Sequence, residues 1–240
     1  WSFNGFISGD TSATIAYTGR NYNTANVTSA NLITVSGLSI TSVAGSNSSA
    51  PEDYVLDSTT KTANATITPK TVSLAVAPKV YDASTDMTGY VSITTGVGSE
   101  TLTYNGATSN DAHVATTGKY LNAITLGNAS DGSGGLASNY QLPTLNVANA
   151  PITITPKTVS LAVAPKVYDA STNMTGYVSI TTGVGGETLT YNGATSNDAH
   201  VATAGKYLNA ITLGNASDGS GGLASNYQLP TLNVANAPIT

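Results

Sequence analysis

The histidines have the clearest capacity for chemistry in this sequence. His113 and His200 each follow an aspartate, Asp111 and Asp198, by two residues, a spacing that on a strand puts both side chains on one face. A general base needs a reacting group beside it, and no serine or cysteine nucleophile motif accompanies either pair. One His and one Asp also make a poor zinc site. We therefore interpret both as surface or edge histidines and predict no catalytic residues and no enzyme activity.

A glycine-rich stretch at 127–135 offers a second kind of chemistry, because oxygen ligands at alternate positions suit a hard cation. Asn128 and Asp131, with their later counterparts Asn215 and Asp218, are weak candidates for binding calcium. Each stretch has a single carboxylate and matches neither the EF-hand nor the nonapeptide repeat pattern. A plain polar loop is the favoured interpretation, and we predict no other metal and no cofactor.

These candidates occur twice because residues 71–153 return almost unchanged as residues 158–240. The period is 87 residues, as from Tyr81 to Tyr168, and internal repetition decides the architecture before any other pattern. A catalytic site is seldom needed twice in series, whereas a spacer is. The paired positions differ at three places: Asp86 and Asn173, Ser99 and Gly186, and Thr117 and Ala204.

The repeat predicts three modules. Residues 67–153 and 154–240 form two full modules, and residues 1–66 read as a diverged module whose opening strands are missing. In that first segment Tyr17 aligns with Tyr104, 87 residues later. The aromatic residues Trp1, Phe3 and Phe6 are expected in its core.

Composition favours folded β-structure and excludes several partners. Charged residues are 9% of the chain, against about 25% in globular proteins, but apolar residues are 40% and β-branched types are common. The net charge of −5 and the absence of a basic cluster argue against nucleic acid and anionic membranes. No apolar run approaches the roughly 18 to 20 residues of a membrane helix, so no membrane insertion is expected.

Short alternating segments separated by turn residues predict an all-β fold of tandem Ig-like β-sandwich modules. Tyrosine is the aromatic residue of the full modules and is expected in their cores. The Asn105-Gly106 pair predicts a hairpin turn. Because Pro151 and Pro156 bracket the junction, with little chain between modules, an elongated rod is expected. The predicted strands are 72–76, 90–93, 101–104, 112–115, 120–126, 140–147 and 152–155.

One motif, Lys79-Val-Tyr81-Asp82-Ala-Ser-Thr85, carries a family resemblance together with a later Asn-Tyr pair and a closing Ala-Pro-Ile-Thr. Asp82 before Ser84 fits an Asx-turn. The motif resembles the YDG-type repeat of large bacterial surface adhesins of the filamentous-haemagglutinin-like kind. The family usually has glycine where this chain has Ala83 and Ala170, so a different local backbone is expected there. The motif residues are Tyr81, Asp82, Tyr168, Asp169, Asn139, Tyr140, Asn226 and Tyr227.

The resemblance implies an extracellular stalk module on a secreted or cell-surface bacterial protein. We expect a structural spacer that projects a binding region of an adhesin or biofilm fibre, with neighbouring repeats as its partners. One alternative is a self-assembling filament in which another copy of the chain completes the first module by strand addition. The other alternative is a carbohydrate-binding repeat.

Overall fold

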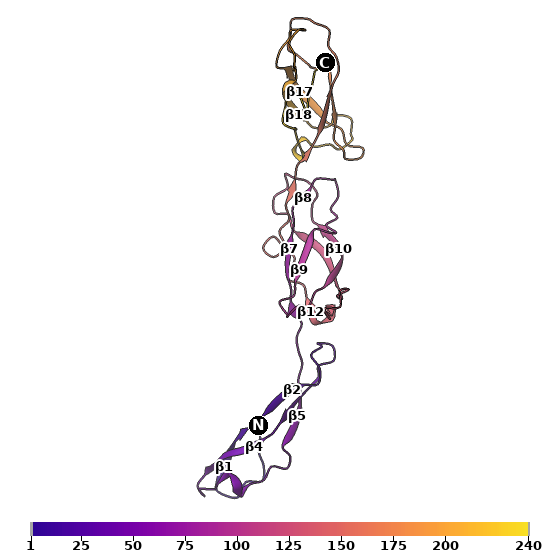
Figure 1. The fold of residues 1–240 in the computed structure, drawn as a ribbon. Coiled ribbons are helices and arrows are strands. Elements are labelled where there is room, and N and C mark those ends of the chain that lie inside the picture. The colour runs from indigo at the N-terminus through magenta and orange to yellow at the C-terminus, as the bar shows by residue number, and fades with distance from the viewer. Residues whose placement is uncertain (1, 240) are drawn as a thin grey trace. The chain divides into compact units, whose positions relative to one another are not determined.

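The computed structural model describes residues 2–239, and it is all-β (Figure 1). No α-helix occurs in this range, where the helical segments are single 3-10 turns. The strands pair in small sheets, mostly of two strands and mostly antiparallel. This follows from the sequence, because β-branched residues alternate with small polar ones and favour extended backbone. The all-β prediction is confirmed.

The chain divides into two compact units. The N-terminal unit contains residues 2–71 and 134–141. It has one two-stranded antiparallel sheet, one three-stranded antiparallel sheet, and a short parallel pair that brings residues 140–141 beside the end of its first segment. Its elements are β1 (Asp10–Ala16) with β4 (Ser39–Gly45), β2 (Gly19–Tyr22) with β3 (Leu32–Ser36) and β5 (Thr60–Asn64), β6 (Lys70–Thr71) with β12 (Tyr140–Gln141), η1 (Pro51–Asp53) and η2 (Ala137–Asn139).

The N-terminal unit has a small core. Within its first segment, the apolar side chains that are fully buried are Ala30 and Leu38, and every residue of β5 is exposed. Phe6 is half-buried and meets Tyr54 edge to face, with ring centroids 5.5 Å apart. The prediction that Phe3 lies in the core is wrong, because its side chain is 37% exposed. Trp1 lies outside the described residues.

The C-terminal unit contains residues 72–133 and 142–239. It holds most of the second repeat (67–153) and the described part of the third repeat (154–239). Its strands recur at the 87-residue period, so the sequence repeat is also a structural repeat (Figure 1). The second repeat has β7 (Ser73–Val76) paired with β9 (Val91–Thr94), and β10 (Thr103–Ser109) paired with β11 (Leu121–Gly127). The third has β15 (Ser160–Val163) with β16 (Val178–Thr181), β17 (Thr190–Ser196) with β18 (Leu208–Gly214), and β14 (Lys157–Thr158) with β19 (Tyr227–Gln228), the latter after η3 (Ala224–Asn226).

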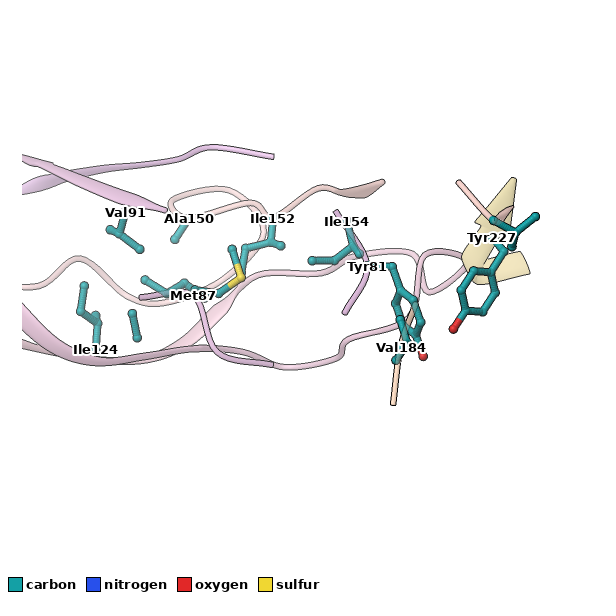
Figure 2. Close-up of a cluster of buried hydrophobic side chains, with 12 residues drawn as sticks. Tyr81, Met87, Val91, Ile124, Ala150, Ile152, Ile154, Val184 and Tyr227 are labelled. Carbon is teal, nitrogen blue, oxygen red and sulfur yellow. The ribbon is translucent and has the colours of Figure 1, made fainter. Parts of the chain in front are cut away.

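Each repeat in the C-terminal unit has its own apolar cluster. In the second repeat Met87, Ala107 and Leu121 are fully buried, and in the third Ala194 and Leu208 occupy the equivalent places. The cluster of the second repeat does not stop at its boundary. It continues past Ile152 and Tyr81 and includes four buried residues of the third repeat, Ile154, Val159, Val184 and Tyr227. Figure 2 shows Ile154, Tyr81, Val184 and Tyr227 at this end of the cluster.

Three local predictions are wrong. β10 runs straight through Asn105-Gly106, and the positive φ of Gly106, 64°, serves a β-bulge where the register with β11 shifts, rather than a hairpin turn. Residues 112–115 form a loop, because the Lys119 ammonium donates to the carbonyls of Val114 and Thr116 and holds them away from a strand pairing. Of the predicted strand 140–147, only the two residues of β12 are extended and paired.

Candidate functional site

The site begins at the turn around Tyr81, which lies in space where the second repeat meets the third. β8 (Lys79–Val80) pairs in parallel with β13 (Ile154–Thr155), and the Tyr81 N–H donates to the carbonyl of Thr155 at 2.9 Å. Asp82 Oδ1 then accepts from the Ser84 N–H at 3.0 Å, which is the predicted Asx-turn. The pairing and the turn together fix where the Tyr81 ring points.

A buried lysine closes the same turn. The side chain of Lys79 is 3% exposed, and its ammonium lies 2.8 Å from Asp82 Oδ1. It also donates to the backbone carbonyls of Ser84 at 2.9 Å and Asp86 at 2.7 Å. Every polar bond of the charged group is therefore made inside one loop, which is the condition for burying an ammonium.

The turn uses left-handed backbone despite its alanine. Ala83 has φ 62° and Ala170 has φ 60°. The expectation that alanine would change the local backbone is therefore wrong. The left-handed conformation persists because the Asx-turn and the lysine bonds surround it, at a cost of about 1–2 kcal/mol for a residue with a Cβ.

A carboxylate from the third repeat joins two tyrosines. Tyr81 OH donates to Glu187 Oε1 at 2.7 Å, and Tyr227 OH donates to Glu187 Oε2 at 2.6 Å. The two rings meet edge to face, with centroids 5.5 Å apart and an interplanar angle of 80°, as Figure 2 shows for this end of the cluster. Both oxygens of the carboxylate are thus used, one for each repeat.

The loop that carries Glu187 is held by one buried threonine. Thr182 Oγ1 donates to the backbone carbonyl of Glu187 at 2.9 Å, and it accepts from the Val184 N–H at 3.3 Å. The Glu187 N–H donates in turn to the Val184 carbonyl at 3.2 Å. This loop places Val184 in the shared apolar cluster (Figure 2). It also positions the Glu187 carboxylate to accept from both tyrosines.

Asn226 makes the second polar contact between the repeats. Its side chain, which is fully buried, accepts from the Val114 N–H at 2.9 Å through Oδ1. Its Nδ2 donates to Nδ1 of His113 at 3.0 Å. The His113 ring also stacks on Tyr81, with centroids 6.2 Å apart and 25° between the planes. His113 therefore acts as a hydrogen-bond acceptor at the junction.

Burial and the carboxylate both act on the tyrosine hydroxyls. Removal from water is the larger effect and the hydrogen bond to ionised Glu187 is the second, and together they raise the pKa of Tyr81 and of Tyr227 well above the ordinary value of a phenol. Both hydroxyls stay protonated donors through neutral pH. This arrangement suits a fixed contact and offers no proton for transfer.

The same amide contact occurs in the N-terminal unit, one period earlier. There Asn139 Oδ1 accepts from the Val27 N–H at 2.9 Å, and Asn139 Nδ2 donates to Oδ1 of Asn26 at 3.2 Å. Asn26 takes the place that His113 has in the later junction. Tyr140, which follows Asn139, is buried like Tyr227. Both Asn-Tyr pairs that the sequence singled out therefore lie in contacts between repeats.

The remaining motif residues lie on the third repeat and have no such partner in the described chain. Asp169 repeats the local contacts of Asp82, with Lys166 Nζ at 2.8 Å and the Ser171 N–H at 3.0 Å. Tyr168, however, is 53% exposed, whereas Tyr81 is 1% exposed. The turn is therefore a local structure, and the burial of its tyrosine depends on what lies against it.

The histidine and aspartate pairs do not form catalytic dyads in the structure. Asp111 and Asp198 accept from the backbone N–H of His113 and His200, both at 2.6 Å, instead of from the imidazole. His200 is exposed at the surface, as predicted, and His113 is half-buried at the junction. The aspartates therefore shape the backbone ahead of each histidine.

The calcium candidates are engaged in hydrogen bonds within their own repeats. Asp131 Oδ2 accepts from Thr101 Oγ1 at 2.7 Å and Oδ1 from the Ser133 N–H at 3.0 Å, and these bonds lower its pKa to about 2. Asp218 repeats the arrangement. Asn215 Oδ1 accepts from the Ala224 N–H, and the Asn128 carbonyl accepts from Thr103. Residues 2–239 contain no cluster of three or more His, Cys, Asp or Glu residues.

Sequence reasoning missed Glu187, the residue that joins the two repeats. Its signal was present, because an acidic residue preserved in both copies of a chain with so few charges calls for a partner. The partner could not be found, since Tyr81 lies 106 residues away along the chain.

Comparisons of the chain with protein-family models, with curated proteins and with solved structures find no match. Within the described range, no helix is long and apolar enough to span a membrane.

Proposed function

We propose that this chain is part of an extracellular spacer, built of tandem Ig-like β-sandwich modules, that holds a binding region of a bacterial adhesin or biofilm fibre away from the cell. The chain's own repeats are its main partners, and its work is mechanical rather than catalytic. The resemblance to YDG-type adhesin repeats supports the secreted or cell-surface location.

The observation that carries the proposal is the junction between the second and third repeats. A spacer needs modules that are joined without slack, and here both a shared apolar cluster and three side-chain hydrogen bonds join them. The amide contact recurs one period earlier with Asn139. Contacts that repeat with the sequence let length and stability add from one module to the next.

The stiffness of the junction can be measured directly. The chain has no cysteine, so cysteines at Ser92 and Ser179, equivalent exposed positions of the second and third repeats, can be spin-labelled cleanly. We expect one narrow distance distribution by pulsed electron paramagnetic resonance. The same labels in a Glu187→Ala, Asn226→Ala background should give a broader one. A broad distribution in the parent chain would contradict the spacer function.

A self-assembling filament is the second candidate, and the N-terminal unit favours it. The outer strand β5 is exposed along its whole length, and the outer strand β2 is largely exposed as well. Beside them, Phe3, Ile15, Leu38 and Val55 line a groove with an apolar wall. A sheet with open edges and so little core gains most from an added strand.

Electron microscopy of the purified chain over a range of micromolar concentrations separates the candidates. Filaments with a regular axial repeat would support the second candidate. Single particles at every concentration would remove it and leave the spacer function untouched.

A further inference from the structure

The junction consists of two complementary surfaces. The surface on the second repeat is formed by Tyr81, His113 and Val114. We call it the acceptor face because it receives the third repeat, whatever the direction of each hydrogen bond. The donor face on the third repeat is formed by Glu187, Asn226 and Tyr227. Three hydrogen bonds join the two faces. The Tyr81 hydroxyl donates to the Glu187 carboxylate, the Val114 N–H donates to the Asn226 amide oxygen, and the Asn226 amide nitrogen donates to the imidazole of His113.

The third repeat carries the same acceptor face in exposed form. Its members are Tyr168, His200 and Val201, and none of the three substitutions between the repeats falls on them. Tyr168 is 53% exposed and Val201 74% exposed, although both are apolar enough to favour burial. An exposed cluster of large apolar side chains around polar groups marks an interaction surface.

The turn and the ring stacking of this exposed face match those of the covered face. Tyr168 and His200 stack with centroids 6.5 Å apart and 28° between the planes, close to the 6.2 Å and 25° of Tyr81 and His113. The Lys166 ammonium holds the turn through the carbonyls of Ser171 at 3.0 Å and Asn173 at 2.8 Å. A partner would therefore find the turn and the stacked rings in place, which lowers the cost of association.

We infer that the acceptor face formed by Tyr168, His200 and Val201 is a docking site for the donor face of a further repeat of this type. That repeat places its counterpart of Glu187 on the Tyr168 hydroxyl and its counterpart of Asn226 between the Val201 N–H and His200 Nδ1. The inference rests on the proposed spacer function and deepens it, because it names the recognition chemistry by which one repeat takes the next.

The partner follows from the chain's own contacts. Both polar groups of the donor face in the C-terminal unit are in use. Glu187 accepts from Tyr81 and Tyr227, and Asn226 accepts from the Val114 N–H and donates to His113. In the N-terminal unit Asn139 is in use on Val27 and Asn26. Both donor faces of the described chain are thus occupied, and the junction between the second and third repeats shows the kind of surface that matches the exposed face.

Single-cysteine labelling tests the inference, because the chain has no cysteine of its own. Val201→Cys is prepared in the 240-residue chain and in a longer chain to which one more copy of residues 154–240 is fused in phase. The thiol should react with a maleimide roughly tenfold or more slowly in the longer chain, since reaction then requires local opening. Val114→Cys in the 240-residue chain gives the reference rate for an occupied acceptor face.

A matched variant shows whether the named contacts provide the protection. In the added repeat, the counterparts of Glu187 and Asn226 are both changed to alanine, and circular dichroism confirms that the longer chain keeps its β-structure. Tyr168→Phe in the longer chain removes only the hydroxyl and serves as a second variant that leaves packing intact. Faster labelling in either variant supports the docking contacts.

Two results would overturn the inference. One is equal labelling of Val201→Cys in the two chains, and the other is protection that persists unchanged in both variants. Neither would overturn the spacer function, which depends on the distance distribution between Ser92 and Ser179. A broad Ser92–Ser179 distance distribution, combined with slow labelling of Val201→Cys in the longer chain, would contradict the spacer function and support the docking contacts.

Discussion

The Tyr81 turn and the Tyr168 turn have the same seven residues, yet one tyrosine is 1% exposed and the other 53%. Both turns keep the lysine–aspartate pair at 2.8 Å, the Asx-turn and the left-handed alanine. The difference therefore lies outside the turn, in Glu187, Val184 and Tyr227, which cover the first tyrosine. Local sequence builds the turn, and a neighbouring repeat makes it an interface.

The largest expected contrast comes from removing each tyrosine. Tyr81→Ala should lower the free energy of unfolding of the second repeat by about 3–5 kcal/mol, as for other large buried aromatic side chains. Tyr168→Ala should cost less than about 1 kcal/mol, because the ring is half in water. Urea unfolding followed by NMR signals of each repeat measures both. Equal losses would show that Tyr81 owes its stabilisation to its own turn.

The next contrast concerns the buried amide. Asn226→Ala leaves the Val114 N–H without its acceptor and opens a gap beside His113, which should cost about 2–3 kcal/mol. Asn209→Ala is the control, since Asn209 is exposed and accepts one bond from Thr195 on the surface of β17 and β18. A loss for Asn226→Ala no larger than for the control would mean that the amide adds nothing to the junction.

Alkaline pH should loosen the junction selectively. The pKa values of Tyr81 and Tyr227 are raised in the folded state, so the folded chain keeps two protons that the unfolded chain releases near pH 10. Their contribution to stability is complete below pH 10 and is lost progressively as the pH rises above it. Unfolding free energies measured from pH 8 to 11.5 should fall less steeply in the Tyr81→Phe, Tyr227→Phe double variant. An unchanged slope would contradict the assignment.

Acid acts on a different part of the repeats and should treat both copies alike. Asp131 and Asp218 have pKa values of about 2, lowered for Asp131 by hydrogen bonds from Thr101 and Ser133 and for Asp218 by those from Ser220 and Thr188. Their contribution to stability is present above the ordinary aspartate pKa of about 3.9 and is lost as the pH falls toward 2. Carboxyl ¹³C shifts should give the same midpoint for both. Different midpoints would show that the loops sense their surroundings.

Sequence patterns predicted well what local chemistry determines. The all-β class and the Asx-turn at Asp82 follow from residue types and spacing over short distances, and the structural period follows from the 87-residue repeat of the sequence itself. The Asn105-Gly106 prediction failed because the pair tolerates a bulge as readily as a turn, and pairing with β11, which no local pattern reveals, selects the bulge.

The junction is where sequence reasoning was weakest. It selected Tyr81, Asn226 and Tyr227 as motif residues but assigned them to separate modules. Glu187 stayed unnoticed, although it bonds both tyrosines. Contacts over more than a hundred residues depend on how one repeat sits on the next, and a single sequence carries no such geometry.

The smallest expected effect tests whether the turns are independent of the interface. Ala83→Gly and Ala170→Gly should each raise the free energy of unfolding by about 0.5–1 kcal/mol, because glycine adopts the left-handed conformation without steric strain. The gain is smaller than the strain removed, since glycine also increases the conformational entropy of the unfolded chain. Since φ is 62° and 60°, the two gains should agree. Ala107→Gly, in a buried strand, is the control and should destabilise. A gain at Ala170 alone would mean that the interface itself imposes the strain at Ala83, and that the two turns are not equivalent.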